Sequence, residues 1–193
     1  MKMFVFLGNP GPEYAETRHN AGWWMLNRLM GNAVTLKEDN QFKGEVGAGV
    51  FWGEKVVLVR PLTFMNSSGE SARAVMDFYK INPEDVYVFY DEIDVNPGDI
   101  KISVGGGAGG HNGIKSMQQH CGDKFTKIRI GVGRPAPGYT IVNWVLGKID
   151  KVSSDLILEG FEKFVEAAPN IFTDFNEFVR TMNTKKKEKK SEK

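Results

Sequence analysis

The sequence has 193 residues and a single cysteine, Cys121, so it cannot form an internal disulfide bond. It contains no apolar run long enough to span a membrane. The opening stretch MKMFVFLGNPGPEY has a short apolar run that passes directly into a Gly/Pro turn, which is not typical of a secretory signal. These absences argue against disulfide-rich secreted proteins and membrane-spanning proteins, and they predict a cytoplasmic location.

Several common catalytic signatures are also missing. The chain has no G-x-S-x-G turn, no H-E-x-x-H or C-x-x-C pattern, and no Gly-Lys-Ser/Thr after its glycine-rich segment. Of its three histidines, His111 and His120 would fall on opposite faces of one helix, so they would not share a metal ion. Cys121 lies on the apolar face of the same helix, which favours a buried structural thiol over a nucleophile.

The net charge of +1 conceals an uneven distribution along the chain. The last ten residues, TKKKEKKSEK, carry six lysines and two glutamates, a net charge of +4, which leaves about −3 for the rest. We expect residues 184–193 to be a disordered lysine-rich tail and residues 1–183 to form one catalytic domain. The tail is interpreted first as a solubilising end; a non-specific contact with a polyanion is the alternative.

The pattern of apolar residues predicts an α/β fold in a single domain. Strands are expected at 3–8, 45–52, 55–60, 86–91, 99–104 and 127–132, the second and third forming a hairpin. Helical stripes lie at 21–30, 67–79, 112–121, 157–168 and 175–182, with Asn20 and Asn112 as expected N-caps. Continuous apolar strands alternating with helices indicate an α/β sandwich around a largely parallel, mixed sheet.

Polar side chains, together with the aromatic ring of Phe64, gather just after the predicted strands. They are Asn9, His19, Arg60, Phe64, Asn66, Asp91, the glycine run with His111 and Asn112, and Arg134. In a mainly parallel sheet the carboxyl ends of the strands share one edge, where ligands bind. The sequence therefore predicts a single site at that edge, although the hairpin must reverse one strand.

The segment GGGAGGHNG at 105–113 allows two interpretations. Gly105, Gly107 and Gly110 match the G-x-G-x-x-G pattern of dinucleotide sites, but Arg134 stands where the expected acidic residue would follow the next strand. We favour a glycine-lined wall that leaves room for a bulky substrate while Asn112 presents its amide. The role of His111 is left open between structure and function.

His19 and Asp91 remain as the pair with catalytic potential. A histidine can act as general base near neutral pH, and a carboxylate on its far nitrogen would orient it and stabilise the imidazolium. Without a nucleophilic serine or cysteine, such a base would activate water, and the asparagines would offer amide donors to a developing oxyanion. On pattern alone, a surface-loop histidine and a loop-capping aspartate are the favoured interpretation.

Four blocks of sequence resemble bacterial peptidyl-tRNA hydrolase, in order, up to about residue 180. They are FLGNPGPEYAETRHNAG (6–22), PLTFMNSSGES (61–71), YDEIDVNPGDIKISVGGGAGGHNGIKSM (90–117) and RIGVGRP (129–135). The resemblance implies a single α/β/α domain with a twisted mixed sheet and no metal or organic cofactor; independently of it, we expect a monomer. It implies an esterase that cleaves peptide from the 3′ ribose of tRNA and recycles tRNA from chains dropped by ribosomes.

The resemblance also implies roles for single residues. His19 looks like the catalytic base, Asp91 like its orienting partner, and Asn9 like the residue that distinguishes a blocked from a free amino group. The positions that contact the tRNA end or the peptide match Tyr14, Phe64, Asn66 and Asn112, with Met65 as a pocket wall. Ser103 departs from a position that is often basic in the family, so the contact with a tRNA phosphate is expected either to be weaker or to shift to Lys101, while Arg129 keeps the other basic position. Ala108 replaces a common histidine, with little effect expected.

Two rival functions belong to other classes. One is a homologue that binds RNA without cleaving it, against which the intact His19–Asp91 pair and the three asparagines argue. The other is a dinucleotide-dependent oxidoreductase, which rests on the glycine pattern alone.

Overall fold

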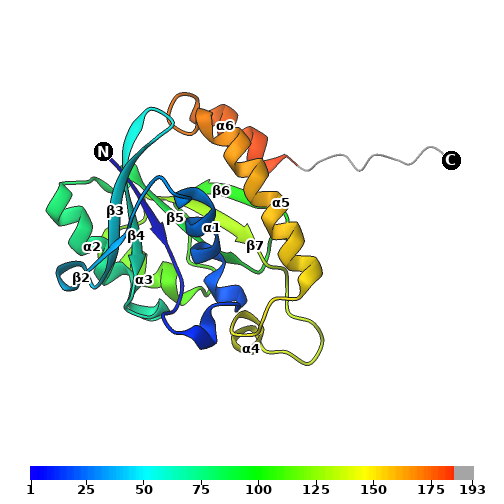
Figure 1. The fold of residues 1–193 in the computed structure, drawn as a ribbon. Helices are drawn as coiled ribbons and strands as arrows, with labels where there is room; N and C mark the ends of the chain where they lie inside the picture. The colour runs from blue at the N-terminus through cyan, green and yellow to red at the C-terminus, as the bar shows by residue number, and fades with distance from the viewer. Residues whose placement is uncertain (185–193) are drawn as a thin grey trace.

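The computed structural model describes residues 1–184 and shows one seven-stranded mixed sheet with helices on both faces (Figure 1). The strand order is β2-β3-β4-β1-β5-β7-β6. The strands are β1 (Lys2–Phe6), β2 (Lys37–Asp39), β3 (Gly44–Phe51), β4 (Glu54–Pro61), β5 (Val86–Glu92), β6 (Ile100–Val104) and β7 (Thr126–Gly131). The predicted α/β fold is confirmed.

The centre of the sheet is parallel and its margins are antiparallel. β1 pairs in parallel with β4 and β5, and β5 pairs in parallel with β7. The antiparallel pairs are β2–β3, β3–β4 and β6–β7. The continuous apolar runs of β1, β4 and β5 lie at this centre and are buried from both sides, as their composition predicts.

Two groups of helices cover the two faces of the sheet (Figure 1). On one face lie α1 (Ala21–Met30), α5 (Lys151–Ala167) and α6 (Phe175–Asn183), which pack on a core rich in phenylalanine. On the other face lie α2 (Ser68–Tyr79) and α3 (Asn112–Cys121). This gives the α/β/α arrangement, with α4 (Ile141–Val145) beside the end of the sheet where α1 begins.

Gly22 brings the start of α1 unusually close to the sheet. A Cβ atom at this position would lie 2.5 Å from the carbonyl oxygen of Leu7 and 2.6 Å from that of Phe89, distances that no side chain tolerates. Only glycine permits this approach. The close packing places the short helix η2 (Arg18–Asn20), and with it His19, against the end of β5.

One strand and one α-helix were not predicted from the sequence. β2 is a three-residue edge strand, KED, that is fully exposed and carries no apolar signal. α4 has only five residues, IVNWV, rich in β-branched side chains that do not favour a helix. Both depend on neighbouring elements for their conformation.

The described chain ends shortly after α6. Across residues 1–184 no helix is both long enough and apolar enough to cross a membrane. The tail predicted at 184–193 lies, apart from Thr184, outside the described residues.

Candidate active site

A cavity of about 390 Å³ opens at the carboxyl ends of the parallel strands. Its lining includes nine residues singled out in the sequence: Asn9, Tyr14, His19, Phe64, Met65, Asn66, Asp91, His111 and Asn112. The predicted convergence at one sheet edge is therefore confirmed for all of these side chains except Tyr14 and Met65, which were not part of that prediction. The cavity is of a size that holds a small ligand or the end of a larger one.

Two arginines predicted at the same edge do not line this cavity. Arg60 pairs with Glu45 on the neighbouring strand, and Arg134 pairs with Asp94. Both guanidinium groups are held by carboxylates, so the expectation that they join the site was wrong.

The glycine run reaches the cavity by an indirect route. Since β6 runs antiparallel to β7, it ends at the opposite side of the sheet from the cavity, contrary to the expectation from sequence. The run from Gly105 to Gly110 carries the chain back along α3, with four of its glycines at positive φ. Lys127 and Gln118 brace it by donating hydrogen bonds to the carbonyl of Gly106. Its last glycines, Gly109 and Gly110, then form part of the cavity wall.

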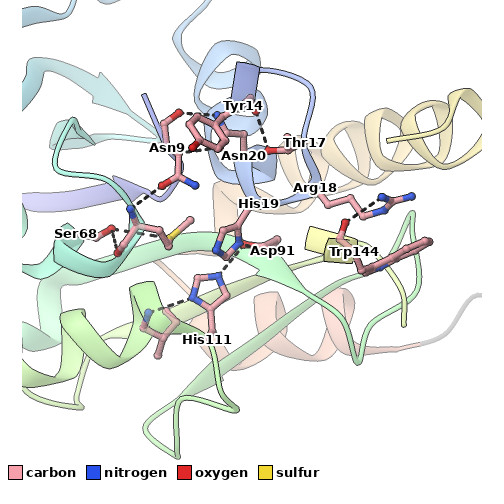
Figure 2. Close-up of polar contacts among 12 residues, drawn as sticks. Asn9, Tyr14, Thr17, Arg18, His19, Asn20, Ser68, Asp91, His111 and Trp144 are labelled. Atoms are coloured by element: carbon pink, nitrogen blue, oxygen red, sulfur yellow. Dashed lines mark hydrogen bonds and ion pairs between the residues drawn. The ribbon is translucent and has the colours of Figure 1, made fainter. Parts of the chain in front are cut away.

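At the floor of the cavity, one carboxylate contacts two imidazoles (Figure 2). Asp91, near the end of β5, is 2% exposed. Its Oδ2 lies 2.8 Å from Nδ1 of His19, and its Oδ1 lies 2.7 Å from Nε2 of His111. The contact predicted between His19 and Asp91 is present, and His111 adds a second one that the sequence did not predict.

The hydrogen bonds assign the proton positions on both rings. The backbone N–H of Ile114 donates to Nδ1 of His111 at 3.2 Å, so Nδ1 carries no proton and Nε2 donates to Asp91. On His19, Nδ1 donates to Asp91. The neutral His19 ring therefore keeps Nε2 unprotonated and available as a base at the cavity.

Burial and charge have opposite effects on the pKa values of Asp91 and His19. Burial, the largest influence, would raise the pKa of Asp91, but the attraction of His19 and His111 and their hydrogen bonds hold that pKa well below its usual range. Burial alone would lower the pKa of His19, yet the charge of Asp91 and its hydrogen bond raise it above the ordinary value. Asp91 is thus ionised at neutral pH and stabilises a proton on His19.

The same three side chains are close enough together to surround a metal ion. A metal would need the lone pair of Nε2 on His111, but that atom carries the proton because Nδ1 accepts from Ile114. The donor set is therefore used for hydrogen bonds to Asp91 and does not fit metal coordination. Burial also raises the pKa of the Cys121 thiol to about 12, which makes it a poor nucleophile.

Asn9 is held rigidly with its amide nitrogen free for the cavity. The backbone N–H of Met65 donates to Oδ1 of Asn9 at 2.7 Å, which fixes the oxygen end of the amide (Figure 2). The side chain of Asn20 clamps the backbone of Asn9, accepting from its N–H at 2.9 Å and donating to its carbonyl at 3.0 Å. Asn20 is the N-cap residue of α1 as predicted, but its side chain makes no cap bond because it is bonded to the Asn9 backbone.

An aromatic pair lines another side of the cavity. Phe64 is 54% exposed and has φ 60° and ψ 161°, a backbone region that is almost restricted to glycine. Its ring meets the ring of Tyr14 edge to face, with centroids 6.3 Å apart. Met65 is buried beside them, and Asn66 is exposed at the rim. A strained, exposed aromatic beside a cavity points to a contact with ligand.

The wall formed by α4 was missed in the sequence. Ile141, Val142, Val145 and Leu146 line the cavity, and all but Val145 are well exposed. Arg18 fastens this wall: its guanidinium lies 3.5 Å from the centre of the Trp144 ring and donates to the Trp144 carbonyl (Figure 2). The exposed apolar pair that follows Thr140 was the signal available in the sequence.

The two residues expected to contact phosphate lie outside this cavity. Lys101 and Arg129 face each other across the β6–β7 pair and line a second hollow of about 340 Å³. Arg129 pairs with Glu92 at 2.8 Å, and Lys101 donates to the carbonyl of Asn183 at 2.7 Å. Both side chains are engaged within the chain, so any phosphate would have to compete with these partners.

Comparisons with known proteins agree with this geometry. A family model described as peptidyl-tRNA hydrolase matches residues 3–191. Peptidyl-tRNA hydrolase of Bacillus subtilis (strain 168) is 42% identical over 187 residues, covering 96% of this chain and 100% of that protein. Its counterpart in Geobacillus thermodenitrificans (strain NG80-2) is 40% identical over 184 residues, covering 95% and 98%.

A solved structure is similar over the same extent. The crystal structure of peptidyl-tRNA hydrolase from Acinetobacter baumannii superposes with a TM-score of 0.90 at 37% identity, covering 96% of each chain. Together with the family model and the curated relatives, this shows that the chain belongs to the peptidyl-tRNA hydrolase family.

Proposed function

We propose that this protein hydrolyses the ester bond between a peptide and the 3′ ribose of tRNA, and so returns free tRNA to translation. The observation that carries the proposal is the unprotonated Nε2 of His19, held by Asp91 in the same cavity as the rigid amide of Asn9. Family membership supports the choice of peptidyl-tRNA as substrate.

His19 acts as general base on a water molecule in the cavity. Nε2 takes a proton from water, and the oxygen attacks the ester carbonyl carbon to form a tetrahedral intermediate. The charge of Asp91 stabilises the resulting imidazolium. When the carbon–oxygen bond to ribose breaks, His19 returns the proton to the ribose oxygen, giving a carboxylic acid and a free hydroxyl group.

Asn9 selects substrates whose amino group is acylated. Since its Oδ1 already accepts from Met65, its Nδ2 points a donor toward the substrate. A peptide carbonyl oxygen accepts this hydrogen bond, whereas the ammonium group of a free aminoacyl ester is itself a donor. The site would thus not hydrolyse aminoacyl-tRNA whose amino group is free.

The remaining cavity residues bind the two parts of the substrate. Asn66 and Asn112 are exposed amides at the rim and suit peptide carbonyls or the attacking water. Tyr14 and Phe64 offer rings for stacking on a terminal base. The apolar side chains of α4 would pack on peptide side chains.

Contacts with the tRNA acceptor stem are assigned to Lys101 and Arg129. They lie opposite each other on neighbouring strands and present two cations on one face of the sheet. If the affinity for tRNA shows no salt-dependent contribution from these two side chains, the phosphate contact would have to be assigned to other residues.

We further propose that residues 1–183 act as a monomeric, cytoplasmic catalytic domain.

The test is His19→Ala, measured on N-acetylated aminoacyl-tRNA. The variant should fold, bind the tRNA and release no amino acid, because water would lack its base. His120→Ala is the matched control, since that histidine lies outside the cavity. Turnover by His19→Ala close to that of the wild type would refute the assignment of the base. Binding without turnover by the wild type would favour the RNA-binding alternative.

A further inference from the structure

The proposed reaction uses one imidazole, yet the structure places two on the same carboxylate. His111 lies at the end of the glycine run and is the N-cap of α3. Its side chain is 10% exposed, and its ring centre lies 4.9 Å from that of His19. A buried titratable group so close to the base calls for a role in the reaction or in its control.

Both ring nitrogens of His111 have separate tasks. Nδ1 accepts from the N–H of Ile114, which satisfies the first turn of α3. Nε2 donates to Oδ1 of Asp91 at 2.7 Å, and capping does not require this second bond. Asparagine, aspartate or serine would cap the helix equally well, so the contact with Asp91 is what distinguishes histidine here.

We infer that His111 is a positioning residue: a hydrogen-bond donor that fixes the rotation of the Asp91 carboxylate and limits how strongly Asp91 holds the proton on His19. This inference rests on the proposed function of His19 as the base. A carboxylate that gives one oxygen to another donor attracts the imidazolium less strongly than a carboxylate with His19 as its sole partner. His19 must take a proton from water and then release it to the ribose oxygen, and an intermediate basicity serves both steps.

Few other groups lie close enough to Asp91 to affect how strongly it holds the proton on His19. Asp91 is faced by His19 from η2 and by His111 at the start of α3. The ring of Tyr90 packs edge to face on His111 at 5.0 Å, and burial raises the pKa of its phenol, so it stays neutral through the working range. Glu92, next along β5, is paired with Arg129.

The test is His111→Asn, which retains a good N-cap but has too short a side chain to reach Asp91. With one donor gone, Asp91 should hold the proton on His19 more tightly. The acid limb of the pH profile of kcat/KM should move to higher pH by about one unit, the equivalent of one hydrogen bond to a charged group. Activity at pH 6 should fall by up to about tenfold, while activity at pH 8.5 should change less.

The matched control is His120→Asn, at the other end of α3, whose ring contacts the carbonyl of Ser116. It should leave the acid limb unchanged. The titration of the His19 ring, followed by NMR in wild type and His111→Asn, should show the same upward shift. This second readout needs no turnover, so it tests the role of His111 even if the protein proves inactive on peptidyl-tRNA.

Two outcomes would overturn the inference. An unchanged midpoint for His19 in His111→Asn, with thermal stability also unchanged, would reduce His111 to a helix cap. A shift of the midpoint to lower pH would show that the second imidazole strengthens the hold of Asp91 on the proton instead of weakening it.

Discussion

Replacing Asp91 with asparagine tests the hydrogen-bond network sharply, because the two side chains have nearly the same shape. His111 must donate to this position, since Ile114 occupies its other nitrogen. The new amide would therefore turn its oxygen toward His111 and its NH₂ group toward Nδ1 of His19. His19 would have to accept there, so its proton would move to Nε2, the atom that must take the proton from water.

The expected magnitude follows from the loss of the correct tautomer. In a histidine-dependent hydrolysis, holding the imidazole in the wrong tautomer lowers kcat by about 10⁴-fold. Asp91→Ala removes the carboxylate but leaves both tautomers of His19 accessible. Its loss should be on the order of 10²-fold, at the lower end of what general base catalysis contributes. Asp91→Asn, although the more conservative change, should thus lower kcat more than Asp91→Ala.

The assay is single-turnover hydrolysis of N-acetylated aminoacyl-tRNA at pH 7.5 with enzyme in excess. Thermal unfolding of each variant controls for the buried position of Asp91, which is 2% exposed. Nitrogen NMR shifts of the His19 ring would report the tautomer directly. If folded Asp91→Asn hydrolyses the substrate as fast as Asp91→Ala or faster, the proton positions assigned to His19 and His111 are refuted.

Three further predictions concern the backbone around the cavity and the contact with tRNA. Phe64→Gly should be more stable than Phe64→Ala by about 1 kcal/mol in urea unfolding, since glycine relieves the strain at φ 60° while both lose the ring; equal stabilities would argue against strain. Gly22→Ala should lower the free energy of unfolding by about 1–3 kcal/mol, because its Cβ would lie 2.5 Å from the carbonyl oxygen of Leu7; a change below about 0.5 kcal/mol would contradict close packing at this position. Lys101→Ala and Arg129→Ala should each reduce the slope of log affinity for tRNA against log salt by about one, and an unchanged slope would exclude a phosphate contact.

The sequence predicted the location of the site because the central strands read clearly as parallel and buried. Asn9, His19 and Asp91 follow or end such strands, and the structure brings them into one cavity. The predicted position at the cavity was wrong for residues that follow an antiparallel strand and for arginines whose guanidinium groups pair with nearby carboxylates. The glycine run begins at the far side of the sheet because β6 is reversed, and its length alone returns it to the cavity.

Tertiary contacts overrode two local rules of helix capping. Asn20 precedes α1 and would suit an N-cap, but its side chain is used to clamp the backbone of Asn9. Asn112 was expected to cap α3, and this was wrong: α3 begins at Asn112 and its cap is His111. A histidine is an unusual cap, and only the position of Asp91 in space explains it.

The wall formed by α4 was unpredictable for a different reason. Its sequence, IVNWV, has no preference for a helix, and its position depends on the stacking of Arg18 on Trp144, which are 126 residues apart. The contact between Arg18 and Trp144 leaves no local signal, and the apolar pair after Thr140 was the one local hint of this wall. The apolar side of the cavity therefore emerges only from the three-dimensional structure.

The most direct test of the proposed activity compares two substrates that differ only at the amino group. N-acetylated aminoacyl-tRNA and the same tRNA with a free amino group would each be incubated with the wild-type protein, and release of the amino acid would be measured. Rapid release from the blocked ester and little from the free one are expected, because Nδ2 of Asn9 offers a donor that suits a carbonyl oxygen. Equal release from both, or release from neither, would contradict the proposed activity and its selectivity.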